Sequence, residues 1–244
     1  MTSKRHFVLP DWNCLEEHEL CHLIEVTVAQ WGICILPGFF SKDFCNKAIS
    51  DIKRLERANN VKIWQDPLGS DKRIMGIGAL APYLELRYDR IIEKVMTSLY
   101  GKAPKAGFTM SGHLQYVQGN LGSGQGWHRD SVNMDQFKTI AYLSDVTSTT
   151  GPFQYYLRTA SERSMRACEK CYGIPKANNR ISVDPQKFLP HSRLTEVLSN
   201  AGALLFANTR AIHRGKPIEQ GQRFALTTYF WERQIPEHIM KYVN

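Results

Sequence analysis

The chain carries three side chains whose types and order suit a transition metal. His128 and Asp130 stand in the run Gly126-Trp127-His128-Arg129-Asp130, and His213 follows far downstream. If the run is extended, residues two apart face the same side, so the imidazole of His128 and the carboxylate of Asp130 point together. Two histidines and one carboxylate on one face of a metal leave three positions open, as in non-haem Fe(II) oxygenases. The three residues are therefore candidate iron ligands and the candidate catalytic centre.

An arginine downstream of His213 is a candidate for holding an acidic co-substrate. The planar guanidinium of Arg223 can bind a carboxylate through two parallel hydrogen bonds, whereas a lysine acts as a point charge. A strand that begins near Arg223 would run beside the strand that bears His213 and place the guanidinium behind the metal. We therefore expect Arg223 to hold the remote carboxylate of 2-oxoglutarate. That co-substrate would take two of the open metal positions and leave the third for O2.

The elements that must position these residues change in type along the chain. Helical patterns come first, and short apolar runs divided by Gly, Asn and Ser follow. Helices are predicted from about Leu15 to Gly32, from Ser41 as N-cap to about Arg57, and over Tyr83–Tyr100 before Gly101. Strands are predicted at Ile33–Leu36, Leu114–Gln118, Thr139–Leu143, Phe153–Leu157, Ala203–Phe206 and Phe224–Trp231.

This order of elements predicts a mainly β protein, an antiparallel barrel or jelly roll with flanking helices. We expect one domain over residues 1–244, in which a helical part, 1–105, packs on a barrel core, 106–235. The polar stretch 160–200 predicts an inserted helix and a long loop, in a place that is common for a lid.

Composition excludes several classes of protein. Hydrophobic residues make up 43% and charged residues 22%, which is ordinary for a soluble globular chain. No apolar run approaches the roughly 20 residues that span a bilayer. The first residues mix charges with little hydrophobic continuity, which argues against a secretory leader and favours a cytoplasmic address. The six cysteines are then expected to be reduced, and Cys168-x-x-Cys171 lacks the second pair that a zinc site of that type needs.

The formal net charge of +8 has two interpretations. Lys and Arg are scattered with no block of like charges, which fits an ordinary basic surface, but a basic chain also suits an anionic small substrate. No nucleic-acid-binding module and no aromatic-basic stripe is visible, so nucleic acid is not an expected partner. Nothing in the sequence indicates an obligate protein partner.

A rival metal motif lies near the start of the chain. His18-Glu19-Leu20-Cys21-His22 matches the zinc-peptidase helix signature, in which the glutamate is the general base. Only 17 residues precede it, too few for the sheet that supports such a helix. No metzincin-type third histidine follows, because Glu25 and Val28 occupy the positions expected for Gly and His. A zinc-dependent hydrolase that uses His18, Glu19 and His22 is one alternative. A non-catalytic, cupin-like binding protein is another, although retention of the three iron ligand candidates and Arg223 argues against it.

The stretch from Gly32 to Trp231 resembles the phytanoyl-CoA dioxygenase family of Fe(II)/2-oxoglutarate oxygenases. The resemblance covers about four fifths of the chain. Four segments match the family in order and are specific in combination. They are Gly32–Ser41, Trp127–Asp130, Ala141–Val146 closing on Gly151–Phe153, and Ala203–Phe206 followed by His213 and Arg223.

The resemblance implies a double-stranded β-helix, which is a cupin-like jelly-roll barrel. It implies that His128, Asp130 and His213 ligate Fe(II), and that a small organic substrate is hydroxylated or otherwise oxidised with release of succinate and CO2. The carboxylate of Asp130 favours hydroxylation over halogenation, because halogenating relatives vacate that metal position for halide. One departure is that many relatives have Ser or Thr two residues after the arginine or the distal histidine, where this chain has Ala225 and Gly215.

Further candidates follow from the same resemblance. Gln115 and Thr139, on neighbouring strands, are candidates for contact with 2-oxoglutarate, with cross-strand hydrogen bonding as the plainer alternative. Arg129 alternates out of phase with the ligands and could instead face solvent. The two aromatic candidates, Tyr155 and Trp231, could be barrel core. The candidates for substrate contact are Arg129, Asn133, Tyr155, Arg158, Arg210 and Trp231.

Overall fold

The computed structural model describes residues 6–174 and 179–244, and within them two antiparallel sheets form the centre of the protein. The larger sheet has the spatial order β1 (Ile33–Leu36), β8 (Leu204–Asn208), β5 (Phe137–Tyr142), β10 (Gln222–Trp231), β4 (Ala106–Gln115), β3 (Asp71–Met75) and β2 (Trp64–Gln65). The smaller sheet has the order β7 (Leu194–Val197), β6 (Phe153–Tyr156) and β9 (His213–Gly215).

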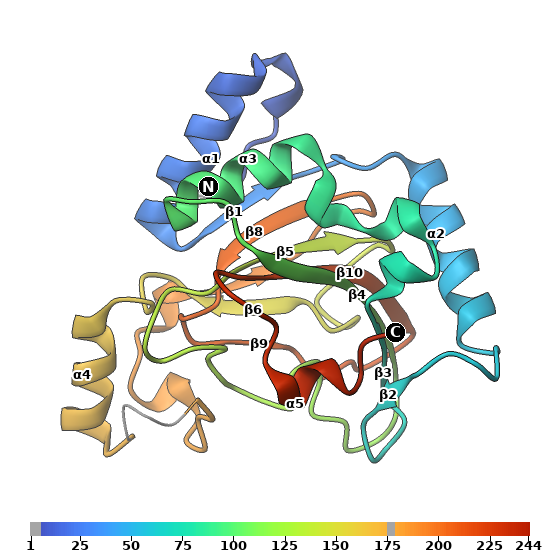
Figure 1. Ribbon diagram of the computed structural model, residues 1–244. Coiled ribbons are helices and arrows are strands. Elements are labelled where there is room, and N and C mark those ends of the chain that lie inside the picture. The colour runs from blue at the N-terminus through green and yellow to red at the C-terminus, as the bar shows by residue number, and fades with distance from the viewer. Residues whose placement is uncertain (1–5, 175–178) are drawn as a thin grey trace.

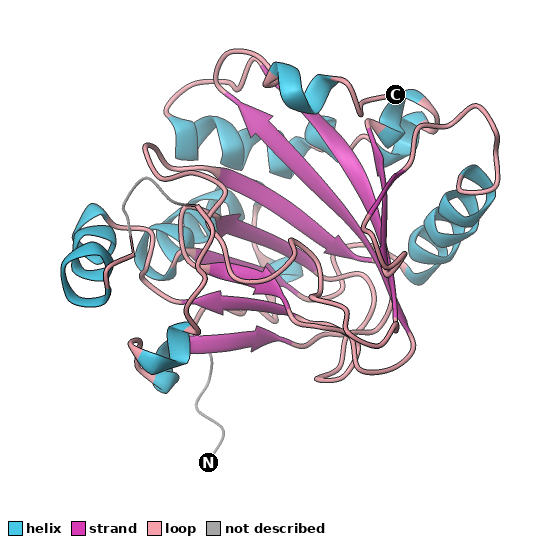
Figure 2. Ribbon diagram, turned by 90° about the horizontal axis from the view of Figure 1, so that it is seen from below, coloured by secondary structure: helices cyan, strands magenta, loops and turns pink. Residues whose placement is uncertain are grey.

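Helices cover one side of the larger sheet. The α-helices are α1 (Glu17–Trp31), α2 (Lys42–Leu55), α3 (Arg90–Tyr100), α4 (Glu162–Tyr172) and α5 (Glu237–Met240). Short 3-10 turns lie at Trp12–Cys14, Ile77–Ala79, Pro82–Leu84, Leu86–Tyr88, Pro185–Lys187 and His191–Arg193. Figure 1 shows α1, α2 and α3 on one side of the larger sheet and β6 and β9 on the other. In Figure 2, which views the protein from below, helices lie behind the strands. The predicted fold, a jelly-roll barrel with flanking helices, is confirmed.

The larger sheet is buried on both faces, because its strands alternate between two hydrophobic clusters. On β10, Phe224, Leu226 and Phe230 pack under the helices, against residues such as Ile52 of α2. The intervening residues of β10 face the smaller sheet across the barrel interior. This alternation decides which residues of each strand can reach a site inside the barrel.

Local signals explain where the helices begin and end. Gly32, with φ +84°, ends α1, and a Cβ there would lie 2.3 Å from the hydroxyl oxygen of Tyr155, so only glycine fits. The hydroxyl of Ser41 accepts a hydrogen bond from the Phe44 backbone N–H at 3.1 Å, as expected for the N-cap of α2. The third predicted helix begins later than expected, because the carboxylate of Asp89 caps α3.

The predicted division of the chain needs correction. The part before residue 106 is not a separate helical layer, since it supplies β1, β2 and β3 to the larger sheet. The segment 160–200 holds α4 but also β7, which pairs with β6, so it is not wholly an insertion. Strand β4 begins at Ala106, ahead of the predicted Leu114, because its polar and small residues hide the strand pattern. In the described ranges no helix combines the length and apolar character needed to cross a membrane.

Candidate metal centre

The fold brings His128, Asp130 and His213 together. His128 and Asp130 lie on the segment between β4 and β5, and His213 opens β9. The backbones of the two histidines exchange hydrogen bonds at 3.0 Å in both directions, and the Asp130 N–H donates to the Thr209 carbonyl at 2.9 Å. One donor atom from each of the three side chains lies within 4.8 Å of the others, and the described residues contain no other such cluster of three. The predicted ligand candidates therefore converge.

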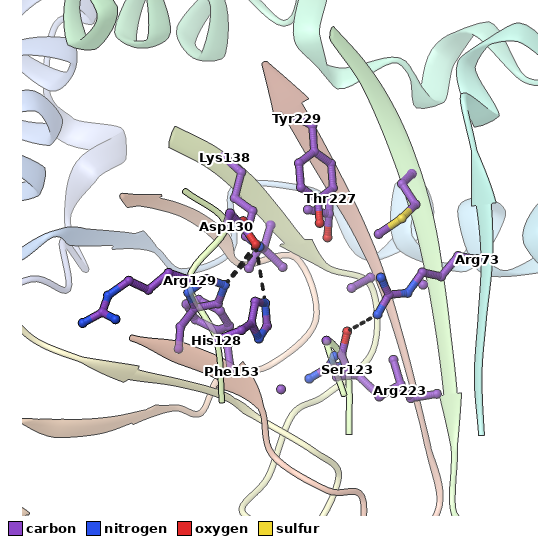
Figure 3. A pocket seen from close by; sticks show the side chains of 18 of the residues that line it. Arg73, Ser123, His128, Arg129, Asp130, Lys138, Phe153, Arg223, Thr227 and Tyr229 are labelled. Atoms are coloured by element: carbon purple, nitrogen blue, oxygen red, sulfur yellow. Dashed lines mark hydrogen bonds and ion pairs between the residues drawn. The ribbon is translucent and has the colours of Figure 1, made fainter. Parts of the chain in front are cut away.

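Both histidines present the same ring nitrogen to the centre. Nδ1 of His128 lies 2.8 Å from the Gly126 carbonyl oxygen, and Nδ1 of His213 lies 2.9 Å from that of Ala211. Since a carbonyl only accepts, each Nδ1 carries the proton and leaves the Nε2 lone pair of the neutral ring for a metal. The two Nε2 atoms lie 3.5 Å and 3.6 Å from Oδ1 of Asp130. Figure 3 shows His128 and Asp130 beside each other in the cavity. Donor atoms that share one metal lie about 3 Å apart, so the set fits a transition metal after a small closure.

A lysine that sequence reasoning missed completes the centre. Nζ of Lys138, on β5, lies 2.8 Å from Oδ2 of Asp130 and 3.4 Å from Nε2 of His213. Lys138 is only 5% exposed, so its charge needs the carboxylate as a partner. The sequence signal for Lys138 is a lysine within the apolar run Phe137–Leu143, where a charged side chain is unusual.

The protonation states suit a divalent cation. Burial raises the pKa of Asp130, but Lys138 and His213 outweigh it and hold that pKa well below the usual value. Burial by itself lowers the pKa of Lys138, but the negative charge of Asp130 and the hydrogen bond to it act in the opposite direction, and the pKa lies above its usual value. Burial, with the nearby charges of His128 and Lys138, lowers the pKa of His213 to about 4. At neutral pH the centre therefore offers a carboxylate and an uncharged His213 ring.

Glycine is required beside His128. Gly124 has φ +83°, and a Cβ built on it would lie 2.2 Å from Cε1 of the His128 ring. The imidazole therefore packs directly on the backbone of the loop before β5, which restricts where the ring can lie.

The centre opens on a cavity of about 360 Å³ between the two sheets. Arg223 lines it and is 5% exposed, and its Nη1 donates to the Gly151 carbonyl. Its Nε has no hydrogen-bond partner among the described residues, and no acidic side chain there forms an ion pair with it. Burial lowers the pKa of Arg223, which is the expected cost of a cation without a counterion. Arg223 thus lines the same cavity as His128, Asp130 and His213, which we call the triad, and its Nε can still donate a hydrogen bond to a ligand.

Arg73 is a second cavity residue that the sequence did not reveal. It lies on β3, 2.5 Å from Asp71, and donates to the Ser123 hydroxyl at 3.2 Å. Because Asp71 is fully buried and pairs with it, Arg73 brings little net charge to the cavity. Figure 3 shows Arg73 and Arg223 on the side of the cavity away from Arg129.

The two predicted co-substrate contacts do not reach the cavity. Gln115 follows Leu114, which faces inward, so its own side chain faces away and donates to the Gly69 carbonyl at 3.2 Å. Thr139 lies between the inward residues Lys138 and Ile140, and its hydroxyl is buried on the opposite face. This prediction is corrected for a simple reason: an offset of one residue in a strand reverses the face.

Two of the six predicted substrate contacts lie near the centre. Trp231 lines a second cavity that adjoins the first. Arg129 borders the first cavity, but its guanidinium extends away from the ligands to Sγ of Cys168 at 3.7 Å, as Figure 3 shows. Its side chain is 2% exposed, so it faces neither the metal centre nor solvent.

The other four predicted contacts are engaged elsewhere, and that part of the prediction is corrected. None of them lines either cavity. Asn133 is exposed, the Tyr155 hydroxyl bonds to the carbonyls of Gly32 and Asn208, Arg158 lies over the Trp31 ring, and Arg210 pairs with Glu162. Tyr155 is barrel core, which was the plainer alternative for it.

The rival zinc motif lies on an exposed helix. His18 and His22 are on the solvent face of α1, and the described residues supply no third ligand near them. The carboxylate of Glu19 accepts a hydrogen bond from the Glu16 N–H at 3.0 Å, in a capping box. The motif therefore serves to begin a helix. The six cysteines are free, with Cys168 buried and Cys171 exposed on α4.

Comparison with known proteins gives a fold relationship without a family. No protein-family model matches the chain, and no curated protein matches it. Among solved structures, the non-heme alpha ketoglutarate dependent epimerase SnoN from nogalamycin biosynthesis aligns with TM-score 0.64 and 13% identity, over 88% of this chain and 84% of SnoN. At such identity the likeness shows the fold alone.

Two further structures align over a similar extent. HygX from Streptomyces hygroscopicus, with nickel and 2-oxoglutarate bound, has TM-score 0.60 and 17% identity, over 89% of this chain and 87% of HygX. EvdO2 from Micromonospora carbonacea var. aurantiaca, complexed with 2-oxoglutarate, has TM-score 0.59 and 13% identity, over 84% of this chain and 88% of EvdO2.

Proposed function

We propose that the chain is an Fe(II)- and 2-oxoglutarate-dependent oxygenase that hydroxylates a small organic molecule. The observation that carries the proposal is the convergence of two imidazole Nε2 atoms and one carboxylate oxygen beside a cavity with a buried, unpaired arginine. A bound iron would supply O2 activation, coupled to oxidation of 2-oxoglutarate to succinate and CO2. Membership of the phytanoyl-CoA dioxygenase family is part of the proposal and rests on the four matching sequence segments.

Support also comes from the proteins that share the fold. A structure of SnoN holds Fe3+, alpha ketoglutarate and nogalamycin RO, and structures of HygX hold iron, or nickel with 2-oxoglutarate. In those proteins the fold binds a metal, a keto acid and, in SnoN, a small molecule. We propose that this chain also binds a metal and a keto acid, because the triad and Arg223 line one cavity.

Each residue of the centre has a defined part in this proposal. His128, Asp130 and His213 hold the metal, and the protonated Nδ1 atoms keep both rings in the coordinating tautomer. Arg223 binds the distal carboxylate of 2-oxoglutarate, which satisfies its unpaired donors. Lys138 balances the charge of Asp130 at Oδ2 and leaves Oδ1 facing the two histidines.

Two buried aromatic side chains stand beside the groups that would bind the metal and the co-substrate. Phe153 of β6 is 5% exposed, and its ring centroid lies 5.4 Å from that of His213. Tyr142 is fully buried, and its ring lies 6.0 Å from the Arg223 guanidinium. A dry, low-dielectric site strengthens the attraction between Arg223 and a carboxylate. The retained carboxylate of Asp130 also occupies the position that a halide would need, which favours hydroxylation.

Metal-dependent binding of 2-oxoglutarate tests the proposal without a known substrate. Equilibrium dialysis of radiolabelled 2-oxoglutarate is performed with Mn(II) in place of Fe(II), to avoid oxidation. We expect retention of the label only when Mn(II) is present, and reciprocal tightening of Mn(II) by 2-oxoglutarate. His213→Ala should abolish both effects, and the matched exposed variant His22→Ala should keep both. Binding of 2-oxoglutarate that is indifferent to Mn(II), or lost in His22→Ala, would contradict the proposal.

A further inference from the structure

A second cavity, of about 370 Å³, adjoins the metal centre. It shares Arg73, Met110, Asp130 and Tyr229 with the first cavity, so the two spaces are continuous at a metal ligand candidate. A compound held in the second cavity would therefore lie directly against the centre. We call this space the aromatic chamber, after Phe108, Tyr229 and Trp231 in its wall.

The three rings form an aromatic cluster, which we call the shelf: Tyr229 and Trp231 stack on each other, and Phe108 is tilted against both. Tyr229 and Trp231 are two residues apart on β10, so both face the inside of the barrel. Phe108 lies opposite Tyr229 on the neighbouring strand β4. Their centroids lie 5.5–5.9 Å apart, with angles of 18° between Tyr229 and Trp231, 31° between Phe108 and Trp231, and 37° between Phe108 and Tyr229. Tyr229 and Trp231 are partly exposed, so the shelf presents ring surface to the space in front of it.

Asp130, Gln136, Asn179 and His238 also line the chamber and offer polar contacts at its edge, and the remaining groups are mostly apolar. Met75 and Met110 contribute thioethers, which contact aromatic rings favourably. Of the nearby cations, Arg73 is paired with Asp71 and Lys138 with Asp130. The unpaired cation, Arg223, lines the first cavity and not the chamber. The buried cation without an ion pair among the described residues therefore lies at the co-substrate end, and the apolar rings and thioethers of the chamber favour an uncharged ring.

We propose that the substrate is a flat, uncharged aromatic compound of about two fused rings, packed against the rings of Tyr229 and Trp231. Offset stacking is the arrangement that aromatic pairs prefer, and the chamber lies at the small end of ligand cavities, which run from about 300 to 1,000 Å³. This replaces the expectation of an anionic substrate drawn from the net charge. The lysine beside the metal centre also faces the shelf, with Nζ of Lys138 5.3 Å from the Tyr229 ring centroid.

The reaction rests on the proposed function, whereas the stacking does not. In the reaction, the C–H bond nearest the metal centre breaks and a C–O bond forms. One atom of O2 enters the product and the other enters succinate, as 2-oxoglutarate loses CO2. The substrate carbon and 2-oxoglutarate each give two electrons, which together account for the four-electron reduction of O2.

Binding of 2-naphthol and of its saturated analogue, decahydro-2-naphthol, tests the inference. Equilibrium dialysis is performed on the full chain in EDTA, so the result does not depend on iron or 2-oxoglutarate. We expect the wild-type chain to bind 2-naphthol about tenfold more tightly than the saturated compound, because only the planar ring stacks. Trp231→Leu should remove most of that preference, and Trp231→Phe should retain most of it. Trp31→Leu, which removes a partly buried indole outside both cavities, is the matched control and should bind as wild type.

Equal binding of the two compounds by the wild-type chain would overturn the inference, as would unchanged binding in Trp231→Leu. Thermal melting and circular dichroism identify a variant that has not folded, and the wild-type preference and Trp231→Phe still decide the question. The two proposals fail separately. Loss of metal-dependent 2-oxoglutarate binding with intact naphthol selectivity refutes the oxygenase alone. The reverse result refutes the aromatic substrate alone.

Discussion

The ammonium of Lys138 lies 2.8 Å from Oδ2 of Asp130, while Oδ1 of the same carboxylate faces Nε2 of His128 and His213 at 3.5 Å and 3.6 Å. The two oxygens of one carboxylate thus have different partners. Oδ2 is neutralised by a side chain, and Oδ1 is directed to the position that a metal would occupy. Lys138 is therefore the internal countercharge that allows a buried Asp130 to remain ionised in the absence of a metal.

Replacing Lys138 by Met should destabilise the metal-free chain and enlarge the stabilisation that a metal gives. Removing one partner of a buried ion pair leaves the other uncompensated, at a cost of roughly 3 kcal/mol. A bound Mn(II) then becomes the remaining countercharge of Asp130 and restores much of that loss. Melting temperatures with EDTA and with Mn(II) measure the effect, and Lys105→Met on an exposed residue is the control. A smaller Mn(II)-induced shift in Lys138→Met than in wild type would refute this role.

Replacing Arg223 by Lys should weaken 2-oxoglutarate binding without changing metal affinity. Lysine keeps the charge but loses the paired donors of the guanidinium, so we expect about a tenfold rise in the Kd for 2-oxoglutarate. Dialysis of labelled 2-oxoglutarate against Mn(II)-loaded protein measures this Kd. Arg158→Lys, at a residue stacked on Trp31 outside the cavity, should leave it unchanged. If Arg223→Lys binds 2-oxoglutarate as wild type does, Arg223 is not the anchor.

Replacing Gly124 by Ala should impair metal binding through His128. The added Cβ meets Cε1 of the imidazole at 2.2 Å, and the ring must move. Gly119→Ala is the matched control, because Gly119 also has positive φ, at +84°, but nothing lies within 4 Å of its Cβ position. Both variants should lose about 1 kcal/mol of stability from backbone strain, but only Gly124→Ala should lose Mn(II) affinity, by about tenfold or more. Equal Mn(II) affinity in the two variants would show that His128 is not held by this contact.

The thiol of Cys34 should resist alkylation in the folded chain. Burial raises its pKa from 9.0 to about 12, so near pH 8 about one thiol in ten thousand is ionised. Iodoacetamide should label the exposed Cys14 and Cys171 and reach Cys34 only in denaturant. Since the folded chain keeps a proton that the unfolded chain loses, this group's contribution to stability falls as pH rises from 9 toward 12. Peptide mass spectrometry measures the sites, and labelling of native Cys34 at the rate of Cys14 would contradict the assignment.

The sequence predicted the convergence of the three candidate metal ligands better than their surroundings. His128, Asp130 and His213 have side-chain types that can ligate a metal, and their order resembles that in a known family, so we could expect them to converge. The jelly roll followed from the same resemblance and from strands separated by turn residues. These signals depend on side-chain type or on local sequence, and they can be recognised without knowing which strands pair.

The residues that the sequence missed depend on pairing and on strand face. Arg73 looks like an ordinary surface cation until the register places it opposite Gly112 inside the barrel. Lys138 differs only in standing within an apolar run, and the register places it opposite Tyr229. Gln115 and Thr139 were predicted inward, but each lies one residue out of phase. Because a strand has a period of two, a local pattern identifies two faces without saying which one meets the smaller sheet.

The most direct test of the central claim is the anaerobic absorption spectrum of the chain with Fe(II), before and after addition of 2-oxoglutarate. If the triad binds iron and the cavity admits the keto acid as a chelate, a weak visible charge-transfer band should appear on addition of 2-oxoglutarate. The band should be absent in His213→Ala and present in His22→Ala. No band in wild type, together with Zn(II) binding that is lost in His22→Ala, would contradict the account and revive the zinc motif of α1.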